Sequence, residues 1–175
     1  MDIVRSLLII CSLCWSFVCV SATEIILPGG LQVPNMKPVG QGELVFLGFR
    51  VYRAQLWAPD GVFREHDPFV LSLRYQRDIR RDQIVEASLK EMRKLGAPVE
   101  QNPHWPSALA NVFRDVSEND TISGIFRPGI GADFYFDSNH TGSIDPVLAK
   151  HLAAIWLDPN TSEPQLRQAL LGEAK

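Results

Sequence analysis

Between Gly40 and Gly96 the chain carries hydrophobic patterns of strand, turn, strand and helix in succession. Leu44–Trp57 is rich in Val, Phe, Tyr and Trp, which predicts one long strand. Its apolar residues fall on both parities, so we expect both faces to be covered, with a bend or bulge at Gly48. After a turn at 58–61, the segment Phe69–Tyr75 predicts a second strand, with Ser72 and Arg74 on the face opposite its apolar residues.

In the remaining patterns, runs of strands are separated by pairs of helices. Asp82–Leu95 has an apolar stripe at helical spacing and ends at Gly96. The further predicted elements are a turn and short edge segment in Leu27–Pro38, a helix at Trp105–Val116, strands at Thr121–Arg127 and Ala132–Asp137, a turn at 139–142 and a short strand at Ser143–Ile144. Asp145 predicts the N-cap of a third helix, and Ser162 with Gln165 predicts a capping box for a fourth. This order indicates an α+β fold, an antiparallel sheet with helices on one face.

Residues 1–22 have the layout of a secretory signal peptide. Arg5 supplies the positive charge, Ser6–Val20 is apolar, and Val20-Ser21-Ala22 ends on small residues, which predicts cleavage after Ala22. The alternative is an uncleaved anchor helix, for which this apolar run is short. We therefore expect a periplasmic or secreted protein with a single domain at 23–175, and no other stretch is apolar enough to span a bilayer.

Composition argues against several classes of function. The net charge is −3, and the basic cluster at 74–81 is interleaved with Asp78 and followed by Asp82, whereas nucleic-acid binding needs a sustained basic stripe. All three cysteines lie in the predicted signal peptide, and no two histidines have the helical spacing of a metal pair. The sequence also lacks a Gly-rich phosphate loop and a nucleophile elbow. We expect no nucleic-acid partner, no metal and no cofactor.

Polar side chains on otherwise apolar strands are the candidate ligand-binding residues. An unpaired buried guanidinium is costly, so each strand arginine must reach water or find an acid. In one interpretation they pair with Glu43, Asp78 or Asp133 on a solvated sheet face. In the other, some reach a cleft between sheet and helices and hold an anionic ligand. The candidate residues are Tyr52, Arg74, Tyr75, Arg127 and Tyr135.

Several motifs resemble the chalcone isomerase-like family, in its bacterial exported branch. They are GFRVYRAQLW (48–57), RYQRD through MRKLG (74–96), FRPGIGADFY (126–135) and IWLDPNTSEPQLRQALLG (155–172). The resemblance implies an open-faced antiparallel sheet covered by helices on one side.

The same resemblance bears on activity. The plant isomerases cyclise chalcones without a cofactor, using Arg, Thr, Tyr and Asn side chains. Alignment on this family places Leu47, Arg80 and Ala87 at the Thr, Tyr and Asn positions, and apolar side chains cannot hydrogen-bond an oxyanion. We therefore assign no catalytic residue. Some relatives bind fatty acids and others bind haem, for which His104 and His151 are the candidate ligands.

These observations lead to one main hypothesis and two alternatives. The main hypothesis is an exported, non-catalytic protein that binds a small apolar or amphipathic anion, fatty-acid-like or phenolic, in a sheet–helix cleft. The first alternative is an intramolecular lyase of chalcone isomerase type. The second is a partner-binding envelope protein without a ligand, which predicts a closed cleft packed with Leu and Phe.

Overall fold

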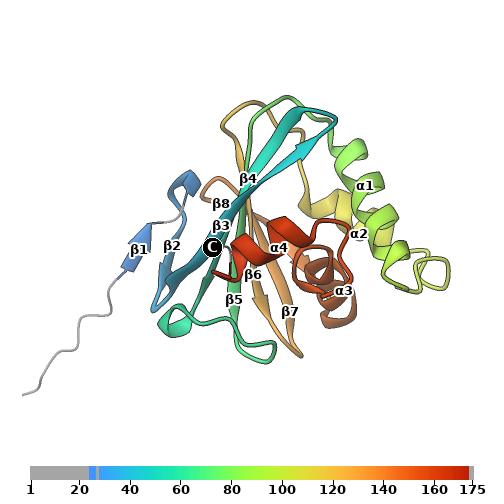
Figure 1. Ribbon diagram of the computed structural model, residues 1–175. Helices are drawn as coiled ribbons and strands as arrows, with labels where there is room; N and C mark the ends of the chain where they lie inside the picture. Colours follow the sequence, from blue (N-terminus) through green and yellow to red (C-terminus); the bar gives the residue numbers. More distant parts are fainter. Residues whose placement is uncertain (1–23, 27, 174–175) are drawn as a thin grey trace, which may run out of the picture.

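The computed structural model describes residues 24–26 and 28–173. The signal peptide predicted at 1–22 lies outside these residues. The described chain forms a six-stranded antiparallel sheet with four α-helices against one face (Figure 1). A two-stranded ribbon near the N-terminus lies on the other side of the sheet (Figure 1). The predicted α+β fold is confirmed.

The strands of the main sheet follow one another in chain order. They are β3 (Lys37–Phe46), β4 (Phe49–Ala58), β5 (Phe69–Tyr75), β6 (Thr121–Arg127), β7 (Gly131–Phe136) and β8 (Asn139–Ile144). The helices are α1 (Arg81–Lys94), α2 (Trp105–Val112), α3 (Pro146–Leu157) and α4 (Pro164–Leu170). The ribbon is β1 (Glu24–Ile26) with β2 (Gln32–Pro34), and two 3₁₀ turns are η1 (Pro28–Gly30) and η2 (Pro59–Gly61). Among the described helices, none has the length and apolar character needed to cross a bilayer.

The segment Leu44–Trp57 is a β-hairpin, so its prediction as one strand is wrong. Phe46 pairs with Phe49 across a turn formed by Leu47 and Gly48, whose φ angles are 50° and 81°. Two positive φ angles match the right-handed twist of the flanking strands, and Asn-Gly is the usual sequence for such a turn. A leucine at the first turn position gave no turn signal, which explains why the hairpin was not foreseen.

The sheet face opposite the helices is covered along its middle. Val70 is fully buried there against Leu31, Val33 and Met36 of the N-terminal segment. Ser72 and its cross-strand neighbour Ser123 are also buried and share a short hydrogen bond between their hydroxyls. This face, which we call the outer face, is therefore partly a second core and only partly solvated.

The helix ends agree with the sequence prediction only in part. α2 ends at Val112 rather than at the predicted Val116, whose backbone instead pairs with Ile79. The Asp145 side chain accepts hydrogen bonds from the backbone of Val147 and Leu148, which confirms the predicted cap of α3. The capping box predicted at Ser162 is wrong, because its hydroxyl donates instead to Glu91 on α1 at 2.6 Å. The predicted turn at 139–142 is also wrong: these residues open β8, because the chain turns earlier, at Asp137 (φ 52°).

We predict that Gly40→Ala destabilises the protein because α4 lies directly on β3. A Cβ at Gly40 would lie 2.2 Å from the Ala169 carbonyl oxygen, and backbone cannot yield cheaply. At Gly42 the nearest atom is the flexible end of Leu166, 2.7 Å away. Gly40→Ala should lower the unfolding free energy by about 1–3 kcal/mol more than Gly42→Ala in urea titrations. Equal losses would contradict this packing of α4.

Candidate functional site

The candidate site lies in the apolar layer between the sheet and α3. The face of the sheet that meets the helices, here called the inner face, carries Tyr52 and Tyr75 as a cross-strand pair on β4 and β5. Their rings contact edge to face with centroids 5.8 Å apart. Only 9% of Tyr52 and 3% of Tyr75 is exposed. The structure therefore brings two of the predicted ligand-binding residues together in the core.

A polar contact joins this tyrosine pair to the helix layer. Trp156 on α3 donates its indole N–H to the Tyr52 hydroxyl oxygen at 2.9 Å. Burial raises the pKa of Tyr52 far above its usual value, an effect that the Trp156 hydrogen bond only partly offsets. Burial also raises the pKa of Tyr75, to which the nearby Tyr52 contributes. Both phenols are therefore held neutral, as hydrogen-bonding groups rather than charges.

A small apolar cavity lies beside Tyr75 and Trp156. Its volume is about 20 Å³, room for roughly one water molecule. None of its lining residues is charged; they are Leu71, Leu73, Tyr75, Phe113, Ile122, Gly124, Phe126, Phe134 and Trp156. Gly124 leaves space that the rings of Phe126 and Phe134 occupy, with Phe126 2.7 Å from where a Cβ would lie. Small-molecule pockets usually have volumes of about 300–1,000 Å³. This cavity is far smaller, so the site is closed.

The other three candidate residues lie on the outer face. Arg74 is exposed and donates to the Asn119 side chain at 2.9 Å, and Arg127 pairs closely with Asp133. The ring of Tyr135 packs edge to face on His140, 5.2 Å between centroids. Asp133 has a lowered pKa because Ser143 and Arg127 both donate hydrogen bonds to it. The structure thus separates Arg74, Arg127 and Tyr135 from the tyrosine pair by the thickness of the sheet.

Two of the acids expected to pair with strand arginines, Glu43 and Asp133, do so in the structure. Glu43 accepts from Arg53 at 2.8 Å and lies 3.7 Å from Arg50. These pairs are at least partly exposed, so each contributes little to stability. Their geometry fits ordinary accommodation of charge on the outer face. It offers no arginine to the cavity, whose lining is uncharged.

Trp156 was missed as a site residue by the sequence analysis. It follows Leu148 and Leu152 at a spacing of four, which places all three on the buried side of α3. That spacing alone could have identified Trp156 as a buried residue of the helix. Its partner Tyr52 is distant in sequence, and no local pattern could have shown their hydrogen bond.

The positions aligned with isomerase polar groups are on the surface here. Leu47 is 81% exposed in the hairpin turn. Ala87 and Arg80 are also exposed, and Arg80 pairs with Asp82. The family alignment at these positions therefore does not locate the inner-face site of this chain.

Neither candidate haem ligand lines the cavity. His104 is exposed, and His151 is half-buried against the Trp105 ring, with centroids 5.5 Å apart. Burial, with a smaller contribution from Lys150, lowers the pKa of His151. In the part of the chain that the structure describes, no three acidic, His or Cys side chains converge as a metal site would require.

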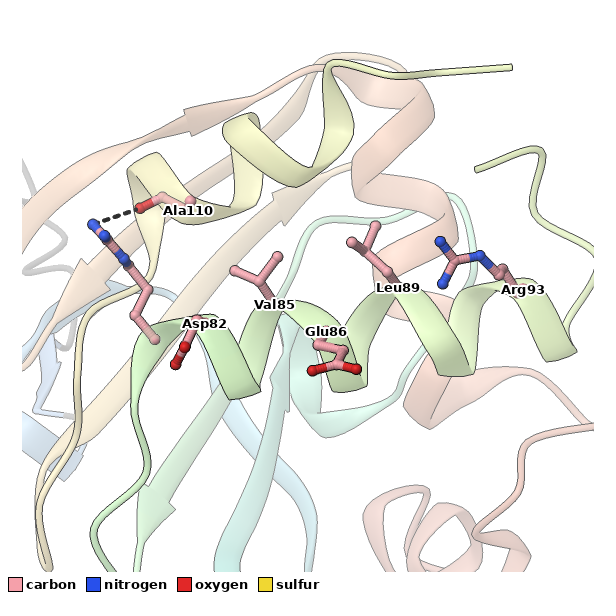
Figure 2. Close-up of a pocket in the computed structure, with 7 residues that line it drawn as sticks. Asp82, Val85, Glu86, Leu89, Arg93 and Ala110 are labelled. Atoms are coloured by element: carbon pink, nitrogen blue, oxygen red, sulfur yellow. Dashed lines mark hydrogen bonds between the residues drawn. The ribbon is translucent and has the colours of Figure 1, made fainter. Parts of the chain in front are cut away.

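A larger hollow is an open groove between α1 and α2, of about 410 Å³. Figure 2 shows Val85 and Leu89 pointing toward α2 and Glu86 pointing away. Arg81 bridges to the Ala110 carbonyl at 3.5 Å, and Arg93 is paired with Glu100 at 2.6 Å. The groove is open to solvent and is lined partly by charged side chains, so it suits an apolar ligand less well than the uncharged interior cavity.

Comparison with solved structures identifies the architecture. A fatty-acid binding protein of Arabidopsis thaliana superposes with a TM-score of 0.62 over 85% of this chain and 95% of that one, at 14% sequence identity. The chain has the chalcone isomerase-like fold. The predicted resemblance is thereby confirmed for the fold, which by itself does not assign an activity.

Sequence comparison adds a relative without a known role. An uncharacterized protein of Haemophilus influenzae is 29% identical over 145 residues, covering 81% of this chain and 70% of that protein. No family model matches the sequence. Neither of these two comparisons indicates a function for this chain.

We predict that Tyr52→Phe destabilises the protein because it leaves the Trp156 indole N–H buried without a partner. Losing a buried partner costs about 1–3 kcal/mol. Tyr135→Phe is the matched control, since that residue is only half-buried on the outer face, and it should cost much less. Urea unfolding followed by circular dichroism measures both. Equal costs would contradict the assigned hydrogen bond.

We also predict a loss of stability at alkaline pH. The folded-state pKa values of Tyr52 and Tyr75 are raised, so above about pH 10 the unfolded chain loses protons that the folded chain keeps. The contribution of these two tyrosines to the free energy of unfolding is therefore fully present below about pH 10 and is lost as the pH rises above it. Urea midpoints at pH 8, 10 and 11 test this. The variant Tyr52→Phe/Tyr75→Phe should show a shallower fall, and an unchanged slope would contradict the assignment.

Proposed function

We propose that this protein is exported and binds a small apolar or amphipathic ligand, fatty-acid-like or phenolic, between the sheet and α3, without catalysing a reaction. The observation that carries the proposal is an uncharged cavity lined by Leu, Ile, Phe and Trp, beside buried neutral tyrosines. The likeness to a fatty-acid binding protein of the same fold supports it.

Binding requires the closed interior to expand. A cavity of about 20 Å³ cannot hold an acyl chain or a phenol ring, so the ligand must displace packed side chains. An apolar ligand offsets the loss of these contacts, because burying its own apolar surface contributes about 25 cal/mol of binding free energy per Å². α3 is the element whose movement would enlarge the cavity, since Trp156 forms one wall and is joined to Tyr52 by a single hydrogen bond.

The head group of the ligand would meet neutral donors. Tyr75 supplies a hydroxyl at the cavity wall, and the Trp156 indole N–H there is already donated to the Tyr52 hydroxyl, whereas the lining supplies no cation. A carboxylate buried without a cation is costly and takes up a proton instead. We infer that a fatty acid binds in its protonated form and that a phenol binds with its hydroxyl intact. This revises the arginine clamp expected from the sequence.

Export is the second part of the proposal. It rests on the sequence pattern of residues 1–22, which ends on small residues at Ala22. The mass of the protein purified from its own host tests it. A chain beginning at Thr23 and recovered from the periplasm or medium is expected; a cytoplasmic chain retaining residue 1 would contradict it.

We predict that the protein copurifies with a small apolar molecule and is stabilised by members of a fatty-acid and phenol panel. Stabilisation should reach about 2.7 kcal/mol at 100 times the dissociation constant. Leu73→Phe adds volume at the cavity wall and should abolish the thermal shift. Ala110→Met fills the α1–α2 groove instead and should leave the shift unchanged.

Three results would decide against this site. No copurified molecule in native mass spectra, together with no thermal shift, would favour the partner-binding alternative, which the closed, tightly packed interior also fits. A shift lost in Ala110→Met but kept in Leu73→Phe would place the ligand in the groove. Cyclisation of a chalcone faster than in solution, and lost in Tyr52→Phe, would favour the isomerase alternative.

A further inference from the structure

The end of the β3–β4 hairpin exposes bulky apolar side chains that the interior does not use. Val45, Phe46, Leu47 and Phe49, here called the hairpin tip, are 51%, 61%, 81% and 64% exposed. Monomeric proteins scatter single apolar residues over their surface, but they rarely gather several at one projection without a role. The tip is the terminal part of one hairpin, which Figure 1 shows in cyan at one end of the sheet.

Apolar groups surround the tip on both of its faces. Phe46 and Phe49 are paired across the turn and share one face, while Val45 pairs with Arg50 on the other. Leu47 is at the apex, in the turn itself. A protein partner with a flat surface would cover one face of such a hairpin. A fluid phase into which the tip inserts covers every side, which fits the observed distribution better.

Basic side chains lie at the base of the tip. Arg50 follows it directly with 69% of its side chain exposed, and the Arg77 guanidinium lies over the Phe49 ring, 5.6 Å from its centroid. The nearest acid on these strands, Glu43, is hydrogen-bonded to Arg53 at 2.8 Å and lies 3.7 Å from Arg50. Asp78 follows Arg77 directly in sequence. The tip itself carries no acid, although the whole chain has a net charge of −3.

We propose that the hairpin tip docks on an anionic lipid surface. Phe46, Leu47 and Phe49 insert at the boundary between head groups and acyl chains, where apolar side chains of membrane-surface proteins are buried. Arg50 and Arg77 remain at the head groups, where each basic residue is attracted by the negative surface potential. This is peripheral attachment by a few side chains, so binding is reversible and weakens as salt rises. The proposal uses no residue of the inner-face site and stands independently of the proposed ligand.

Leu47→Asn separates this role from folding. Asn-Gly is the preferred sequence for a turn with two positive φ angles, so the substitution should keep or raise the melting temperature. It removes the apex side chain and should lower partitioning onto vesicles about tenfold. Ile130→Asn is the matched control, since Ile130 is 73% exposed in the β6–β7 turn at the opposite end of the sheet.

The experiment is cosedimentation with vesicles of phosphatidylcholine containing 30% phosphatidylglycerol, compared with phosphatidylcholine alone, at low and high salt. The protein begins at residue 23, which keeps every described strand and helix and removes the apolar segment at 6–20, itself able to bind lipid. We expect salt-sensitive binding to the anionic vesicles, unchanged in Ile130→Asn and reduced in Leu47→Asn. Arg50→Gln with Arg77→Gln should reduce the preference for anionic over neutral vesicles.

Absence of vesicle binding by the unaltered protein would overturn the proposal, as would equal binding by Leu47→Asn and Ile130→Asn. Sedimentation velocity without lipid provides the competing outcome. A dimer that becomes monomeric in Leu47→Asn, with no vesicle binding, would assign the tip to self-association instead.

Discussion

The hydrogen bond between Trp156 and Tyr52 is the interaction on which the arrangement of the interior depends. It is a specific polar contact between α3 and the inner face within a layer that is otherwise apolar. Because both groups are buried, either one left alone would cost more than the bond itself contributes. The contact therefore links α3 to β4 through Tyr52. It also fixes the wall of the cavity, which Trp156 shares with Tyr75.

The sheet separates two different environments. Its inner face is apolar and neutral, and burial keeps its two tyrosines protonated. Its outer face holds the paired charges of Arg53, Arg127 and their acids, together with a small core beneath the N-terminal ribbon. The inner face therefore offers hydroxyl groups without a countercharge. An anion that requires arginine would have to bind elsewhere on the molecule.

The helices and strands were predicted correctly where the local sequence contains a clear hydrophobic pattern or capping residue. The stripe of α1 and the cap at Asp145 needed no tertiary information. The hairpin was missed because Leu47 adopts a positive φ without being Asn or Gly, so the turn is imposed by the pairing of the flanking strands. The capping box failed because Ser162 has a better partner in Glu91, distant in sequence.

The candidate site was predicted only in part for a related reason. Alternation along β5 correctly places Arg74 and Tyr75 on opposite faces, but grouping them as one site ignored that alternation. Trp156 belongs to the site through a contact across the fold that no sequence spacing encodes.

The most direct test of the central claim is the indole N–H resonance of Trp156 in ¹⁵N-labelled protein, followed while decanoic acid is added. If a ligand enters between α3 and the sheet, this resonance shifts with a saturating dependence. The indole of Trp57, which packs against the outer-face core, remains unchanged. A shift at Trp57 alone, or no shift at either indole while the acid is bound, would contradict an inner-face site.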